Sequence, residues 1–259
     1  FTVGTNTNVN GSSATYVSWN WKAANSAGST NDDGNVTSTV SANTTAGFSI
    51  VKWTGTGSDL TVGHGLGVAP DVVIVKNYDN GGMNWVVRHV SLGNSSILKL
   101  NTNETPFSNT NYIVPTATTF SGKASTALST SGEKCIAYCF AEKTGYSKFG
   151  SYTGNGSNDG TFIFCGFKPA FIITKNTSDT YHWNTNDAAR DPINVASKRL
   201  YPSSGNEEVT SSNYYLDFLS NGFKIRTSHA SINNSGHTFA YLAFGQSLVG
   251  SNDIPCTAR

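Results

Sequence analysis

One feature constrains the fold of this chain above all others: a unit of roughly a hundred residues occurs in it twice. The segment FSIVKWTGTGSDLTVGHGLGVAPDVVIVKN, which begins at Phe48, matches YSKFGSYTGNGSNDGTFIFCGFKPAFIITKN, which begins at Tyr146. Seven residues recur 99 positions later: Thr54, Gly55, Gly57, Gly67, Pro70, Lys76 and Asn77 become Thr153, Gly154, Gly156, Gly166, Pro169, Lys175 and Asn176. Repetition at a fixed spacing indicates structural units in tandem. We therefore predict two copies of one fold, at residues 47–143 and 145–248.

The ends of the two units also correspond. Four residues of the first unit, Ser131, Gly132, Phe140 and Glu142, fall 104 positions before Ser235, Gly236, Phe244 and Gln246. A partial third copy occupies the start of the chain, where Phe1, Trp19 and Trp21 fall 119 positions before Phe120, Tyr138 and Phe140. We therefore predict that residues 1–24 are the C-terminal hairpin of a preceding unit.

Two further segments lack the apolar residues of a core. Residues 25–46 are rich in Ser, Thr, Asn and Gly, a composition typical of linkers. Residues 249–259 are mostly polar and are expected to form a tail. The chain is therefore predicted to consist of a hairpin, a linker, two units and a tail.

Within each unit the strand signals are short and frequent. DVVIVKN and AFIITKN are nearly continuous runs of β-branched and aromatic residues, which is typical of strands buried on both faces. NWVVRHV, SILKLN, NGFKIRTSH and TFAYLAF add strands bounded by Gly, Asn and Ser turns. The glycines of TGTG and TGNG can supply positive φ in such turns. These patterns predict an all-β protein of tandem β-sandwich or jelly-roll-like units.

The composition argues against several classes of partner. Only 13 % of the residues are charged and the formal net charge is +1, so there is no basic surface for nucleic acid or for an anionic membrane. The sequence contains no run of about 18 apolar residues that could insert in a membrane. We therefore expect neither nucleic acid nor membrane insertion.

Cysteine and histidine residues give no sign of a metal or cofactor site. Four cysteines, Cys135, Cys139, Cys165 and Cys256, form neither a disulfide framework nor a CxxC pair and are expected to be buried free thiols. The five histidines show no ligand spacing. The glycine-rich GHGLG at 63–67 is followed by a strand rather than a helix, so a β-turn is expected there instead of a phosphate-binding loop.

An enzyme that cleaves polysaccharides is the principal catalytic alternative, because such enzymes use paired carboxylates. No pair of acidic residues on one strand face is recognisable in the sequence. Asp187, Arg190 and Asp191 in NDAARDP are the densest charged group. We expect a local ion pair that fixes a loop there, and we predict no catalytic residues.

Several motifs taken together resemble a known class of protein. They are YVSWNWKA, TSTVSANTTAGFSIV, VGHGLGVAPDVVIVKN, IAYCFAEKTGYSKFGSYTGNGS, GFKPAFIITK, DAARDP and DFLSNGFKIR. Their order is similar to that of a module in large structural proteins of tailed marine bacteriophages, in tail fibres and other virion appendages. The resemblance covers essentially the whole chain. It implies a virion context and receptor binding, and it assigns no functional residues.

Receptor binding of this kind would use exposed aromatic side chains beside polar ones, because sugar rings stack on flat apolar faces. Trp85 and Trp183 occur at matching places next to Asn, and we expect them to be structural in both units. Aromatic residues without a counterpart are the candidates for glycan contact. The predicted contact residues are Tyr78, Asp79, Asn80, Tyr181, His182, Tyr214 and Tyr215.

The sequence therefore predicts a non-enzymatic virion protein, most simply a tail-fibre segment that adheres to host-surface glycans. Its expected partners are further copies of itself in a homotrimer, other virion proteins, and a host glycan or protein. Two alternatives stay open: a purely structural component such as a head decoration or fibre shaft, and a bacterial extracellular adhesin.

Overall fold

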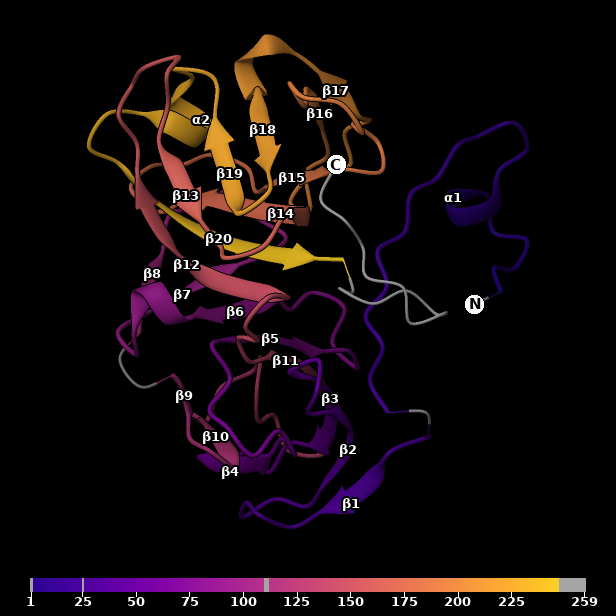
Figure 1. Cartoon of the computed structure of the whole chain (residues 1–259). Coiled ribbons are helices and arrows are strands. Elements are labelled where there is room, and N and C mark those ends of the chain that lie inside the picture. Colours follow the sequence, from indigo (N-terminus) through magenta and orange to yellow (C-terminus); the bar gives the residue numbers. More distant parts are fainter. Residues whose placement is uncertain (1, 25, 110–111, 247–259) are drawn as a thin grey trace.

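We describe the fold from a computed structural model, which places residues 2–24, 26–109 and 112–246. Nearly every regular element is a strand, and the strands pair antiparallel throughout (Figure 1). The predicted all-β sandwich fold is confirmed. Within the described residues the helices are single turns: α1 (Thr7–Asn10), α2 (Ala230–Asn233), and the 3-10 turns η1 (Val90–Leu92) and η2 (Ser212–Tyr214).

The first unit is built on an eight-stranded sheet in the order β1-β2-β3-β11-β5-β6-β7-β8. Its strands are β1 (Ser29–Asn31), β2 (Ser38–Asn43), β3 (Phe48–Thr54), β5 (Val72–Asn77), β6 (Val86–His89), β7 (Ser96–Lys99), β8 (Phe107–Ser108) and β11 (Lys134–Phe140). A smaller sheet in the order β4-β10-β9 packs on one face; it comprises β4 (Leu60–Gly63), β9 (Ile113–Pro115) and β10 (Thr119–Gly122). Val73, Val75, Leu60 and Phe120 belong to the core between the two sheets.

The second unit repeats this plan. Its larger sheet has the order β12-β20-β14-β15 and its smaller sheet the order β13-β19-β18. The strands are β12 (Ser147–Thr153), β13 (Phe162–Phe164), β14 (Pro169–Asn176), β15 (Asn184–Asp187), β18 (Leu216–Leu219), β19 (Gly222–Ile225) and β20 (Thr238–Gly245). An extra two-stranded sheet joins β16 (Lys198–Arg199) to β17 (Val209–Thr210).

The strand register shows that the two units correspond residue by residue. Phe140 lies opposite Val72 in the first unit, and Phe244 lies opposite Phe171 in the second. These pairs are separated by the same 104 and 99 positions that relate the two units in the sequence. In each larger sheet the strand that comes last in the unit, β11 or β20, takes a central position.

Residues 25–46, predicted to be a linker, form part of the first sheet instead. Strand β2 pairs with β3, and β1 pairs with β2 at the sheet edge. The prediction was wrong because backbone pairing needs no apolar side chain on the outer face. Ser38 and Val40 supply the buried positions of β2, and Ala42 is partly buried against the same core.

The first residues differ from the prediction as well. Residues 2–24 contain no strand, so the expected hairpin is absent from the described part of this segment. The chain forms α1 and then runs extended beside both units (Figure 1). A strand needs a partner for its backbone N–H and C=O groups. From Thr15 to Ala23 the backbone makes no hydrogen bond to the backbone of any described residue.

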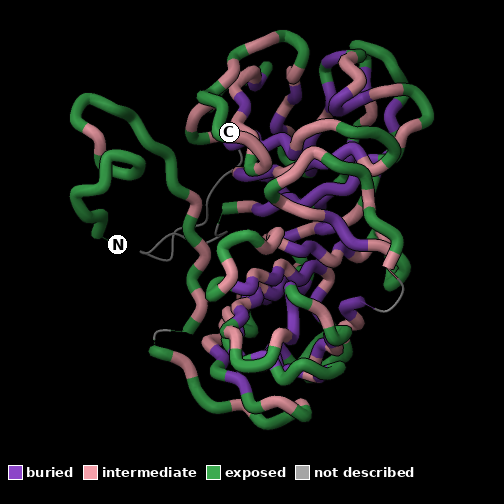
Figure 2. The backbone as a smooth tube through the Cα atoms, turned by 180° about the vertical axis from the view of Figure 1, so that it is seen from behind, coloured by how far each residue is buried: buried purple, intermediate pink, exposed green. Residues whose placement is uncertain are grey.

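A third core joins the two units. The larger sheets turn their outer faces toward each other, and residues such as Phe48, Phe140, Phe149 and Phe244 fill the space between them. Burial is continuous through both units, whereas the first residues are mostly exposed (Figure 2). The two units are therefore packed through an aromatic interface.

The repeated glycines have two separate roles. Gly57 and Gly156 have φ of +80° and +67°, the left-handed conformation that favours glycine in turns. Gly55 and Gly154 instead allow close approach, because an added Cβ would lie 2.3 Å from the carbonyl oxygen of Thr130 or Asn234.

Three of the predicted free thiols, Cys135, Cys139 and Cys165, are unpaired and buried. Cys256 and the predicted tail at 249–259 lie outside the described residues. The helices in the described part of the chain are all too short to span a membrane.

Candidate functional site

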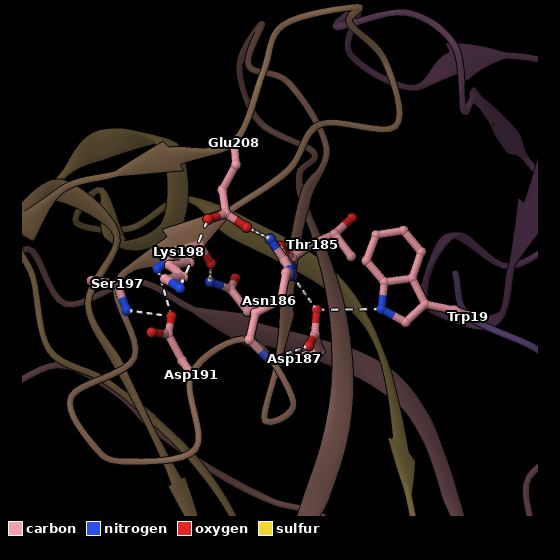
Figure 3. Close-up of polar contacts among 9 residues, drawn as sticks. Trp19, Thr185, Asn186, Asp187, Asp191, Ser197, Lys198 and Glu208 are labelled. Carbon is pink, nitrogen blue, oxygen red and sulfur yellow. Dashed lines mark hydrogen bonds and ion pairs between the residues drawn. The ribbon is translucent and has the colours of Figure 1, made fainter. Parts of the chain in front are cut away.

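The densest charged group of the sequence forms a network at the end of β15 (Figure 3). Asp187 is buried, and its Oδ2 lies 2.5 Å from Nε of Arg190. Its Oδ1 accepts the backbone N–H of Arg190 at 2.9 Å. The predicted ion pair that fixes this loop is therefore present.

The network extends on both sides of Arg190. One guanidinium nitrogen lies 2.9 Å from Oε2 of Glu208, and another donates to the carbonyl oxygen of Thr185 at 3.2 Å. Asp191 accepts the backbone N–H groups of Ser197 and Lys198 at 2.8 and 2.6 Å. The carboxylates of this loop are thus engaged by backbone N–H groups or cationic side chains.

Asp187 also holds the N-terminal segment. The indole Nε1 of Trp19 donates to Oδ2 of Asp187 at 3.3 Å, and the Arg190 guanidinium carbon lies 5.6 Å from the centre of the Trp19 ring (Figure 3). A hydrogen bond to a carboxylate together with a cation–π contact fixes both the edge and the face of the ring.

A second cluster surrounds Arg199, which is 2 % exposed. Its guanidinium lies 2.9 Å from the ring centre of Tyr214 and 4.3 Å from that of Tyr201, and it donates to the hydroxyl of Tyr201 and to the side-chain oxygen of Asn184. Burial lowers the pKa of this guanidinium. Aromatic faces and neutral acceptors therefore solvate a buried cation.

Two predicted contact residues border this cluster. Nδ1 of His182 lies 2.9 Å from the Ser203 hydroxyl, and its ring meets the edge of Tyr201. Tyr214 meets His229 edge-on and covers Arg199. Burial and then the charge of Arg199 lower the pKa of His182. Tyr214 therefore contacts Arg199 directly, whereas His182 reaches the cluster through Tyr201, and both have structural contacts.

Tyr215 does not fit the expectation that it lacks a counterpart. The pairing of β18 with β19 places Leu216 opposite Ile225, as β9 places Ile113 opposite Gly122. Tyr215 therefore occupies the position of Tyr112, 103 residues earlier. Sequence comparison missed this because the spacing between the units shifts from 99 to 103 residues in the intervening loops.

The turn after β5 contains three of the predicted residues. Asp79 accepts the backbone N–H of Lys134 at 2.8 Å, and Asn80 accepts that of Gly82 at 3.2 Å. These two side chains hold the turn in place. Tyr78 between them and the strand is 46 % exposed. Tyr181, in the equivalent loop between β14 and β15, is half-buried.

In the described part of the chain no group of three or more His, Cys, Asp or Glu residues is arranged to hold a metal ion. His64 is buried and lies 3.2 Å from the carbonyl oxygen of Thr116, and burial lowers its pKa. GHGLG begins at Gly63, the last residue of β4, and leads toward β5 with positive φ at Gly65 and Gly67, as expected of a turn.

A large aromatic groove was not predicted. It has a volume of about 1290 Å³ and lies between the N-terminal segment and the two units. Trp19, Trp21, Trp85, Tyr138 and Tyr201 are among its lining residues. The aromatic residues that recur at matching positions were a sequence signal for this groove, but their pattern favoured places in a core.

Residues 1–247 match the model of a family described as a domain of unknown function, DUF7483. Neither the curated proteins nor the solved structures contain a match.

Proposed function

The chain belongs to the DUF7483 family, and we propose that this member is a structural protein of a virion appendage that attaches to glycans on a host surface. The proposal follows from the order of sequence motifs, which resembles that of phage tail-fibre modules. The chain would act by display and adhesion, without catalysis, and as part of a homo-oligomer.

One structural observation supports adhesion in particular. The loop that follows the same strand in each unit presents a tyrosine beside polar residues. Tyr78 is followed by Asp79 and Asn80 in the first unit, and Tyr181 by His182 in the second. A tyrosine face with adjacent hydrogen-bonding groups suits a sugar ring. Two such loops on one chain, multiplied in an oligomer, would raise a weak affinity by avidity.

Binding of the 259-residue chain to a glycan array and to host cells tests this proposal. We expect Tyr78→Ala and Tyr181→Ala each to weaken binding about tenfold, because an aromatic contact at the centre of a site contributes most of its affinity. Phe107→Ala is the matched control, since Phe107 is 52 % exposed on β8 and belongs to neither loop. Absence of binding by the unaltered chain, or equal loss in the Phe107 variant, would contradict adhesion through these loops.

The virion location needs a separate measurement. Antibodies against the chain should label purified particles at the tail or another appendage. Labelling of a bacterial cell surface and not of particles would support the adhesin alternative, and labelling of particles without glycan binding would support a purely structural role.

A further inference from the structure

The contacts among the two units and the partial N-terminal copy follow one rule, which is incomplete for one of the copies. The first contact of this rule involves the end of the strand that pairs with β5 in the first unit and with β14 in the second. His89 at the end of β6 lies 3.1 Å from the carbonyl oxygen of Tyr241 on β20, the last strand of the second unit. Asp187, at the matching end of β15, accepts from Trp19 of the N-terminal segment. Ser18, the residue before Trp19, is the sequence counterpart of Tyr241.

Three equivalent aromatic residues meet where these contacts converge. Trp21, Phe140 and Phe244 hold the same position in the partial copy, the first unit and the second unit. Their ring centres are 5.9, 5.1 and 5.5 Å apart in the three pairings, and every pair meets edge to face at 63° to 77°. Three equivalent rings in mutual edge-to-face contact are what a pseudo-threefold arrangement of the three copies would produce.

The second contact of the rule covers the outer face of each larger sheet. In the second unit, Phe149 and Leu242 are buried beside Trp183, whose Nε1 donates to the carbonyl oxygen of Lys99 in the first unit at 2.8 Å. The first unit therefore covers this face of the second.

Part of the same face of the first unit is less covered, although Phe48, Val72 and Phe140 at its other end are buried between the units. Ile50 and Tyr138 are the counterparts of Phe149 and Leu242, yet both are half-buried and line the groove. Trp85, the counterpart of Trp183, stacks on Tyr138 with ring centres 6.2 Å apart, and its Nε1 donates to no described residue. An exposed apolar face rimmed by polar residues can mark an interface.

The N-terminal segment has the features of a strand without a sheet. Trp19, Trp21 and Ala23 contact the aromatic interface, while Asn20 and Lys22 between them are exposed, which is the alternation of a strand. Among the described residues its backbone makes no hydrogen bond to another backbone group, and its one partner is the Asn43 side chain, which donates to the carbonyl oxygen of Lys22 at 3.1 Å. A strand from another part of the fold can therefore pair with it. The equivalent strands β11 and β20 are central in their sheets and pair on both sides.

We propose that a third sandwich of this repeat, carried by the same polypeptide, fills the groove and takes residues 15–23 as its central strand. Its larger sheet would cover Ile50, Trp85 and Tyr138 as the first unit covers Phe149, Trp183 and Leu242. The three sandwiches would then be arranged around the axis marked by Trp21, Phe140 and Phe244. We place this third sandwich on the same polypeptide because residues 15–23 lead into the first unit and match in sequence the strand with which each unit ends.

Comparison of the 259-residue chain with the complete natural polypeptide tests this proposal. The amides of residues 15–23 should exchange with deuterium rapidly in the 259-residue chain and at least about a hundredfold more slowly in the complete polypeptide, because strand pairing protects them. Equal exchange in both, or the absence of another unit of this repeat from the complete polypeptide, would overturn the proposal. Protection that develops in the 259-residue chain with rising concentration would overturn it too, since a second copy would then fill the groove.

The equivalent tryptophans provide a matched pair of variants. Trp183→Phe should lower the midpoint of thermal unfolding by about 3–6 °C in both polypeptides, because it removes a buried hydrogen bond in each. Trp85→Phe should leave the 259-residue chain unchanged and should lower the midpoint of the complete polypeptide by a similar amount. A Trp85→Phe variant without effect in the complete polypeptide would show that this face stays uncovered.

Discussion

His89 of the first unit donates a hydrogen bond from Nε2 to the carbonyl oxygen of Tyr241 in the second, across 3.1 Å of buried interface. The backbone N–H of Ser91 points at Nδ1 of the same ring, so Nδ1 is the acceptor and the proton of the neutral ring is on Nε2. Burial lowers the pKa of His89 to about 4. The interface therefore requires a neutral imidazole.

This requirement makes stability depend on pH. The unfolded chain binds a proton at His89 below its ordinary pKa of about 6.5, whereas the folded chain does so only near 4. Between these values the unfolded state holds more protons, so the free energy of unfolding falls as the pH is lowered from 6.5 to 4. We expect this residue to contribute a loss of roughly 3 kcal/mol over that window.

Urea denaturation at a series of pH values measures this loss. His89→Gln removes the titration and should flatten the pH dependence between 4 and 6.5, although it lowers stability at pH 7. His182→Gln is the comparison, because His182 is half-buried and its ring contacts Ser203 of its own unit instead of a group across the interface. An unchanged slope in the His89 variant would show that other groups cause the acid sensitivity.

The matching glycines Gly55 and Gly154 should tolerate no side chain. A Cβ at either position would lie 2.3 Å from a backbone oxygen, which cannot move without displacing its strand connection. We expect Gly55→Ala and Gly154→Ala each to lower the free energy of unfolding by about 2–4 kcal/mol. Gly205→Ala has nothing within 4 Å of the added Cβ and should be neutral in the same denaturation experiment.

Trp19 should act as an anchor for the N-terminal segment. Trp19→Phe keeps an aromatic ring but loses the donor to Asp187, so we expect faster tryptic cleavage after Lys22 with little change in global stability. Asp187→Asn also weakens the ion pair with Arg190 and should in addition cost about 2–3 kcal/mol of unfolding free energy. Equal cleavage rates in all three proteins would contradict the anchoring role.

The buried thiols should be chemically silent in the folded protein. Burial raises the pKa of Cys135, Cys139 and Cys165 to about 12 in each case, and only the thiolate is nucleophilic. In a Cys256→Ser variant, reaction with a disulfide reagent at pH 8 should proceed at the rate of global unfolding. A fast phase that modifies one of the three would show local access to it.

The sequence was most informative where the repeat and the hydrophobic pattern agreed. Runs such as VVIVKN and FIITKN predicted β5 and β14, and both are buried on the two faces as expected. The spacing of 99 residues between matching motifs predicted that the two units share one strand order. β1 has no apolar residue and β2 has only Val40 and Ala42, so neither showed a strand pattern and both were missed.

The contacts of the candidate site depend on distant parts of the chain. Arg199 is surrounded by Asn184, Tyr201, Tyr214 and Ser231, which lie on four different elements or loops. No local spacing brings these residues together in the sequence. The ion pair of Asp187 with Arg190 was predictable because its two members are three residues apart.

The central place of β11 in its sheet sets the order in which the first unit can fold on the ribosome. β3 and β5 are synthesised long before β11, yet each pairs with β11 and not with the other. The larger sheet therefore stays in two halves until residue 140 has left the ribosomal tunnel. Pairing over such sequence separations folds slowly and leaves strand edges open in the meantime. The nascent chain would need protection from aggregation until each unit receives its last strand.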